Sequence, residues 1–206
     1  MGKTIIKEVS IFFSDIVGYS SMIARDEKVA LQLLDEHDLI LEAHIAKNNG
    51  HIIKHIGDAI FARFDSSLAA VNSALEFQRI LQKRNQISRD EDKIVVRAGL
   101  HFGEVVERDG DLFGHDVNLG ARVEAIAEPG SICVTGSVAD ELDKTFLMRE
   151  VGDVKLKNIS EPQRVYKLYL DQSQLDSDQY QGYLHNNKWH VLIVYLLRLI
   201  PLILKS

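Results

Sequence analysis

Apolar and polar residues follow two different periods along the first 170 positions, and these periods predict a chain of alternating strands and helices. Short apolar or alternating runs predict strands at 9–13, 51–56, 59–64, 93–100, 104–107, 132–135, 146–151 and 164–170. Apolar residues spaced three or four apart predict a helix at 27–47 after the Gly18 turn, and further helices are predicted at 116–127 and 137–142. Residues 65–67 (DSS) predict the cap of another helix that runs to about residue 84. Strands and helices mixed in this way predict an α/β domain in which helices flank a sheet.

Turn residues indicate where neighbouring strands are joined. Gly57-Asp58 separates 51–56 from 59–64 and predicts a tight hairpin. The sequence His101-Phe102-Gly103 allows a second hairpin between 93–100 and 104–107. The alternating run 164–170 is typical of an edge or near-edge strand.

The sequence changes character after residue 170. Residues 171–188 are polar and predict a linker, because they offer little apolar surface to bury. Residues 189–206 form a hydrophobic segment whose apolar run, 189–204, is shorter than the roughly 20 residues that a spanning helix needs. Arg198 and Pro201 also interrupt it. We expect a truncated membrane anchor or a helix lying in the membrane interface, and a helix packed in a dimer is the alternative.

Composition limits the class of protein. The 206 residues are 46% hydrophobic and 26% charged, which fits one soluble domain over residues 1–170 with a tail. A net charge of −6 argues against a nucleic-acid-coating protein. The only cysteine, Cys133, lies in an apolar run and predicts a buried thiol. Met1 is not followed by a long apolar run, so we expect no secretory signal and a cytoplasmic domain, which residues 189–206 would attach to a membrane if they form an anchor.

Two aspartates lie where predicted strands meet turns. Asp15 follows the apolar run 9–13, and Asp58 lies in the turn after 51–56. Burying an unpaired carboxylate is costly, so two of them at strand ends indicate a shared cation. Mg²⁺ prefers one or two carboxylates together with water and substrate phosphates, which indicates a nucleoside triphosphate as substrate. Taken singly, Asp58 is also typical of a plain turn residue.

Four motifs in order carry a family resemblance: 13–19 (FSDIVGY), 54–58 (KHIGD), 97–104 (RAGLHFGE) and 111–122 (DLFGHDVNLGAR). Over roughly residues 7–170 the chain resembles the catalytic domain of the class III adenylyl and guanylyl cyclases. The resemblance implies an α+β sandwich with a ferredoxin-like core, an antiparallel sheet and flanking helices. It also implies active sites at the interface of a head-to-tail homodimer.

The resemblance further implies which residues hold the metals and read the base. Asp15, Asp58 and the backbone carbonyl of Ile16 match the ligands of two Mg²⁺ or Mn²⁺ ions per site. Lys54 and Asp111 match the donor and acceptor that read adenine, whereas guanylyl cyclases have other residue types there. Taken alone, Lys54 is also typical of an outward-facing strand residue.

The remaining roles concern the ribose and the phosphates. Asn118 matches the residue that orients the ribose, and Arg122 matches the one that meets charge on the phosphate. Their spacing of four puts them on one helical face, although Arg122 alone is also typical of a solvated charge. Arg97 and Lys157 match residues that bind the terminal phosphates. The backbone beside those phosphates is matched by Gly18 and Tyr19.

We therefore expect an adenylyl cyclase that converts ATP to cyclic AMP and pyrophosphate. Because one chain carries every residue type that the reaction needs, a homodimer would have two complete sites. Two alternatives stay open: a catalytically silent, cyclase-like regulatory or nucleotide-binding module, and a guanylyl cyclase.

Overall fold

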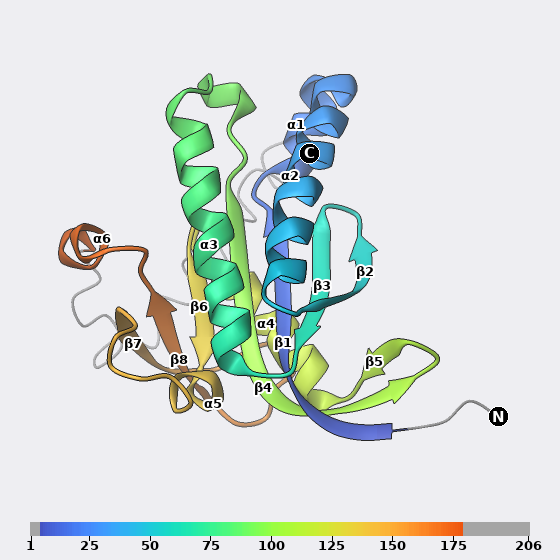
Figure 1. Cartoon of the computed structure of the whole chain (residues 1–206), viewed down its shortest axis with the longest axis vertical. Coiled ribbons are helices and arrows are strands. Elements are labelled where there is room, and N and C mark those ends of the chain that lie inside the picture. The colour runs from blue at the N-terminus through green and yellow to red at the C-terminus, as the bar shows by residue number, and fades with distance from the viewer. Residues whose placement is uncertain (1–4, 179–206) are drawn as a thin grey trace, which may run out of the picture.

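One mixed sheet organises the protein, whose computed structural model describes residues 5–178 (Figure 1). The strand order is β2-β3-β1-β4-β6-β8-β7, and β5 pairs with β4 outside this path. The strands are β1 (Ile5–Ile16), β2 (His51–Ile56), β3 (Ala59–Phe64), β4 (Val96–Arg108), β5 (Asp111–Phe113), β6 (Ile132–Thr135), β7 (Met148–Val154) and β8 (Gln163–Leu168). All pairings are antiparallel except the one between β4 and β6. The predicted α/β class is confirmed, with one parallel pair added to the expected antiparallel sheet.

Helices cover both faces of this sheet. They are α1 (Tyr19–Arg25), α2 (Glu27–Lys47), α3 (Ser67–Gln86), α4 (His115–Ile126), α5 (Gly136–Ala139) and α6 (Gln172–Ser177), with a short 3₁₀ helix at Asp90–Asp92. Alternate residues of β1 point to opposite faces: Phe12 packs in a core with residues of α2 and α3, whereas Ile11 packs on the side of α4. Figure 1 shows α2 and α3 in front of the strands and α4 behind them.

The hairpin expected at residues 101–103 does not form, because β4 continues through them and pairs with β1 from Val96 to Glu107. Gly103 has a packing role instead of a turn role. A Cβ at this position would collide with Asp116 Oδ2 and come within 2.8 Å of His101 Nε2, so a larger residue would displace these two side chains.

The first residues of the predicted linker, 171–188, are not an irregular segment. Residues 172–177 form α6, whose end is held on the domain by Arg149, which donates hydrogen bonds to the carbonyls of Leu175 and Asp178. β8 lies between β6 and the edge strand β7, which confirms the near-edge prediction. No helix within residues 5–178 is long and apolar enough to cross a bilayer, and the hydrophobic segment at 189–206 lies outside the described residues.

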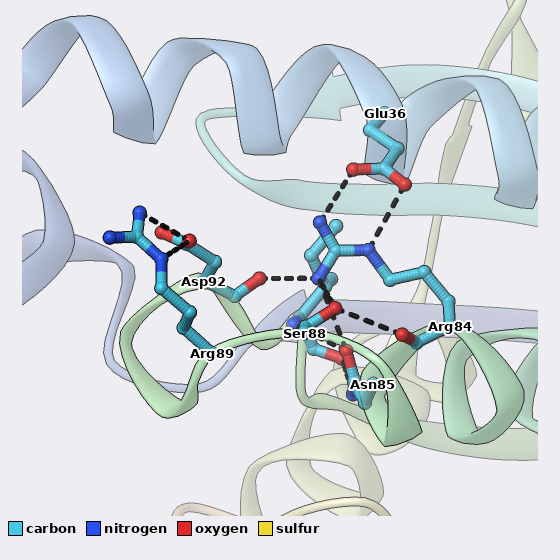
Figure 2. Close-up of polar contacts among 7 residues, drawn as sticks. Glu36, Arg84, Asn85, Ser88, Arg89 and Asp92 are labelled. Carbon is cyan, nitrogen blue, oxygen red and sulfur yellow. Dashed lines mark hydrogen bonds and ion pairs between the residues drawn. The ribbon is translucent and has the colours of Figure 1, made fainter.

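An arginine near the end of α3 ties three segments together (Figure 2). Arg84 forks onto Glu36 of α2, with Nε 3.0 Å from Oε1 and Nη2 2.6 Å from Oε2. Its Nη1 donates to the carbonyl of Asp92 and to Ser88 Oγ at 3.2 Å. We call these residues the Arg84 latch, because they fasten α2 and the loop before β4 to α3.

Cys133 lies in β6 and is buried, as predicted. Burial raises the pKa of its thiol to about 12, so the thiol stays protonated and unreactive at neutral pH.

Candidate active site

The two aspartates predicted to bind metal come together at one end of the sheet. Asp15 is the next-to-last residue of β1, and Asp58 lies in the tight turn between β2 and β3. Asp58 Oδ2 accepts a hydrogen bond from the backbone amide of Ile16, with an N to O distance of 3.1 Å. The hairpin between β2 and β3 therefore brings the carboxylate of Asp58 to the end of β1, where Asp15 lies.

The environment of Asp58 disfavours its negative charge. Burial is the main cause that raises the pKa of its carboxyl group, and the nearby charge of Asp15 raises it further. Hydrogen bonds from the backbone amides of Asp58 and Ile16 act in the opposite direction. A cation shared by the two carboxylates would relieve this repulsion.

Arg97 of β4 is the register partner of Asp15 on the neighbouring strand β1. Its Nε is 2.6 Å from Asp15 Oδ1, and its Nη2 bonds to Asp15 Oδ2, so the guanidinium holds both oxygens of the carboxylate. These contacts raise the pKa of Arg97, with the hydrogen bond to Asp15 as the largest cause. The residue expected to bind phosphate thus contacts a residue expected to bind metal.

Glu124 of α4 joins this cluster and was not predicted from the sequence. Its Oε1 lies 2.7 Å from Arg97 Nε, but no aligned hydrogen bond reaches this buried oxygen. Burial and the charge of Asp15 raise the pKa of Glu124 to about 8, although Arg97 acts to lower it. Helical spacing offered a signal for Glu124. Residues four apart lie on the same face of a helix, and Gly120 faces the sheet, so an acid at position 124 lies on the sheet-facing side.

Two glycines allow α4 to lie close enough for this contact. A Cβ at Gly99 of β4 would collide with the backbone of Glu124, and a Cβ at Gly120 would meet Ile11 of β1 at 2.7 Å. The close approach of helix to sheet fixes Glu124 at the level of Arg97.

The turn after β1 contains a glycine in the left-handed region. Gly18 adopts φ 79° and precedes α1, and its carbonyl accepts the amide of Ser21 at 2.9 Å. Tyr19 begins α1, and burial followed by the charge of Asp58 raises the pKa of its hydroxyl. Both residues therefore lie near Asp15 and Asp58. Their contact with phosphates stays a prediction.

Lys54 and Asp111 also meet, although 57 positions separate them in the sequence. Lys54 Nζ lies 2.5 Å from Asp111 Oδ2, and this contact is the main cause that lowers the pKa of Asp111. The ammonium group is 5.9 Å from the ring centroid of Phe61, which stacks on Phe13 at 4.4 Å. A donor and an acceptor are thus held side by side, and the donor lies over the ring of Phe61.

Asn118 and Arg122 do not join either group. At 100° per residue, Arg122 lies about 160° and Asn118 about 120° around α4 from Glu124, the acid that contacts Arg97. Asn118 is exposed and Arg122 is half-buried. Their common helical face is as predicted, and it points away from the carboxylates of the same chain.

Lys157 lies at the other end of the sheet from Asp15. It follows β7 in the connection to β8, beyond the pairing of Val154 with Gln163. The Asp15 end of the sheet corresponds instead to the last residue of β8, Leu168, as the chain of strand pairings requires. Within one chain Lys157 cannot reach Asp15 and Asp58.

Asp15 and Asp58 fit a divalent cation whose other ligands are water and phosphate oxygens. Within residues 5–178 no three acidic, histidine or cysteine side chains are grouped as metal ligands. Asp15 and Asp58 supply two carboxylates, Asp58 is disfavoured as a free anion, and a cationic side chain already occupies Asp15. Mg²⁺ and Mn²⁺ accept such a set when water and phosphates complete the shell.

Comparison with known proteins gives the class to which this fold and site belong. The family model described as "Adenylate and Guanylate cyclase catalytic domain" matches residues 2–170. The chain therefore belongs to the family of adenylate and guanylate cyclase catalytic domains. Among solved structures, an adenylate/guanylate cyclase/hydrolase from Silicibacter pomeroyi is 36% identical, with a TM-score of 0.74 over 82% of this chain and 100% of that one.

More distant relatives agree with this assignment. A putative adenylate cyclase 3 of Rhizobium meliloti (strain 1021) is 32% identical over 162 residues, 76% of this chain and 27% of the relative. An adenylate cyclase of Streptomyces coelicolor is 29% identical over 68% of this chain and 35% of its own length. The chain thus spans about a third of these relatives. The adenylyl cyclase CyaB from P. aeruginosa shares the fold, at 22% identity and a TM-score of 0.73 over 81% of this chain and 96% of that one.

Proposed function

We propose that this chain is the catalytic domain of an adenylyl cyclase that acts as a homodimer. In the reaction the ribose 3′-oxygen of ATP forms a bond to the α-phosphorus, and the bond from that phosphorus to the bridging oxygen of the β-phosphate breaks. Cyclic AMP and pyrophosphate are the products, and the hydroxyl proton passes to solvent.

The observation that carries the proposal is the separation of two half-sites on one chain. Asp15 and Asp58 converge at the end of β1, whereas Asn118 and Arg122 point outward from α4. A second copy placed head to tail would bring the outward pair of one chain to the carboxylates of the other. Two equal sites follow from the twofold symmetry of such a dimer.

Asp15, Asp58 and the carbonyl of Ile16 would hold divalent cations in this site. When bound, these ions supply positive charge that lowers the pKa of the 3′-hydroxyl and stabilises the phosphoryl oxygens. Arg97 and the backbone at Gly18 would then bind the terminal phosphates, and Arg122 of the other chain would meet charge that develops at the α-phosphate.

Lys54 and Asp111 support ATP as the substrate. Their contact holds one donor and one acceptor at a fixed spacing, which matches the ring nitrogen and exocyclic amine of adenine. Guanine presents a carbonyl and a ring N–H at those places and would leave both protein groups unmatched. We expect kcat/KM for ATP to exceed that for GTP by at least about tenfold, and equal values would contradict the adenine assignment.

Mixing two inactive variants tests the shared site. In a dimer of Asp15→Ala with Arg122→Ala, one site collects both lesions and the other collects neither. A one-to-one mixture should therefore recover about a quarter of wild-type cyclic AMP formation with Mn²⁺ and ATP.

The controls for this experiment are subunit exchange, measured with differently labelled chains, and each variant mixed with wild type. No recovery despite exchange would contradict interfacial catalysis. If wild-type protein binds ATP but forms neither cyclic AMP nor cyclic GMP, the silent nucleotide-binding module replaces the proposed enzyme.

A further inference from the structure

One guanidinium lies between two carboxylates at the end of β1. Arg97 contacts Asp15 through two nitrogens and Glu124 through Nε. All three side chains are largely buried, with exposed fractions of 17% for Arg97, 20% for Asp15 and 14% for Glu124. One cation facing two acids leaves an unbalanced negative charge when both are ionised.

The two acids are not bound equally. Asp15 has both oxygens in the guanidinium fork, whereas Glu124 Oε1 is close to Nε without an aligned hydrogen bond. A divalent cation would bind through the same two oxygens of Asp15, and its charge would repel the guanidinium that lies against them. Arg97 and a divalent cation therefore compete for Asp15.

We propose that Arg97 is a placeholder cation for Asp15, and that Glu124 is the positioning residue that receives it when a divalent cation binds. The orphaned oxygen of Glu124 already lies 2.7 Å from Arg97 Nε, so a small rotation of the guanidinium exchanges one carboxylate for the other. Glu124 then keeps Arg97 beside the phosphates after it has left Asp15. This inference rests on the proposed metal role of Asp15, but its test requires no turnover.

A purely structural role for Glu124 makes a different prediction. If Glu124 only fastens α4 to β4, its loss lowers stability and leaves metal affinity unchanged. If Glu124 acts on the metal by its own charge, its loss weakens binding whether Arg97 is present or absent. Only the placeholder arrangement makes the effect depend on Arg97.

Mn²⁺ binding without nucleotide, measured by calorimetry or by the electron paramagnetic resonance signal of free Mn²⁺, separates these cases. Glu124→Gln should weaken Mn²⁺ binding by about threefold to tenfold, because Arg97 then stays on Asp15. Arg97→Gln should tighten binding by a similar factor. In the double variant the Glu124→Gln effect should fall below about twofold.

Glu36→Gln provides the matched control, since Glu36 is also an acid forked by an arginine and lies in the Arg84 latch. It should leave the Kd for Mn²⁺ unchanged, and thermal melting in chelator should verify that each variant is folded. An equal effect of Glu124→Gln in both Arg97 backgrounds would overturn the proposal. So would unchanged binding in Glu124→Gln, or no measurable binding by both wild type and Arg97→Gln.

Discussion

The Arg84 latch and the Arg97 cluster use the same side chain for opposite purposes. Arg84 forks one carboxylate and gives its remaining nitrogen to oxygens that carry no full charge, so the latch is balanced (Figure 2). Arg97 forks one carboxylate while a second acid, Glu124, lies against it with an unsatisfied oxygen. The balanced group has each charge matched, whereas a second acid beside one arginine perturbs pKa values, which is typical of functional sites.

The pKa values of the two glutamates express the same contrast. The hydrogen bond from Arg84 is the main cause that lowers the pKa of Glu36, which keeps this acid charged. Burial and Asp15 raise the pKa of Glu124 to about 8 even though an arginine is adjacent. An arginine neighbour therefore does not by itself identify a structural ion pair, because the number of acids that share it matters as well.

The largest expected effect comes from removing either of the two carboxylates, Asp15 and Asp58, that we propose as metal ligands. Asp15→Asn or Asp58→Asn should lower kcat for cyclic AMP formation by at least about 100-fold, because each loses a ligand for the divalent cation. Neither change removes core volume, so circular dichroism and melting should remain close to wild type. Near-normal activity of either variant at saturating Mn²⁺ would contradict the metal assignment.

Breaking the balanced latch should affect stability instead of chemistry. Arg84→Ala removes the fork on Glu36 and leaves the carbonyl of Asp92 without this donor, which should cost about 1–3 kcal/mol in free energy of unfolding. Denaturant titration measures this loss. Below the unfolding temperature, kcat should stay within about twofold of wild type, and a larger fall would show that the latch supports the site directly.

The pH dependence of stability should be opposite at the two glutamates in metal-free protein. Because the pKa of Glu124 is raised from its ordinary value of 4.5 to about 8, the folded state retains a proton that the unfolded chain has lost between these values. Stability should therefore fall as pH rises through this window. Glu124→Gln should flatten the decline and be more stable than wild type at pH 8 by about 1–2 kcal/mol.

At Glu36 the sign reverses, because a lowered pKa contributes stability that is present above pH 4.5 and is lost as pH falls below it. The effect should be smaller than about 1 kcal/mol, since the side chain of Glu36 is 42% exposed. Denaturant titrations from pH 3 to 9 in chelator, on wild type and on Glu124→Gln and Glu36→Gln, measure both slopes. Slopes of the same sign at the two positions would contradict the opposite pKa shifts of Glu124 and Glu36.

Local patterns predicted many elements closely. The helix at Glu27–Lys47 and the strands at 51–56, 59–64 and 132–135 have the predicted bounds, because their periodicity and turn residues are contained in short stretches of sequence. The prediction of a hairpin at 101–103 was wrong, because a glycine in the sequence is compatible with a turn and with close packing alike. Only the pairing of β4 with β1 shows that Gly103 serves packing.

The candidate site divides in the same way. Ordered motifs in the sequence indicated Asp15 and Asp58, and the structure brings both to the end of β1. Glu124 was not predicted, because its role depends on Arg97, which is 27 positions earlier and on another element. No local pattern reports a pairing of this kind.

The sequence alone determined the class of fold, the positions of most elements and the residue types available for chemistry, because these depend on local periodicity and ordered motifs. The tertiary structure decided which charges meet. It placed Arg97 between Asp15 and Glu124, joined Lys54 to Asp111, and turned Arg122 outward. The physical reason is that electrostatic energy depends on distance and burial in space, and both are set by strand register and by how closely α4 packs on the sheet.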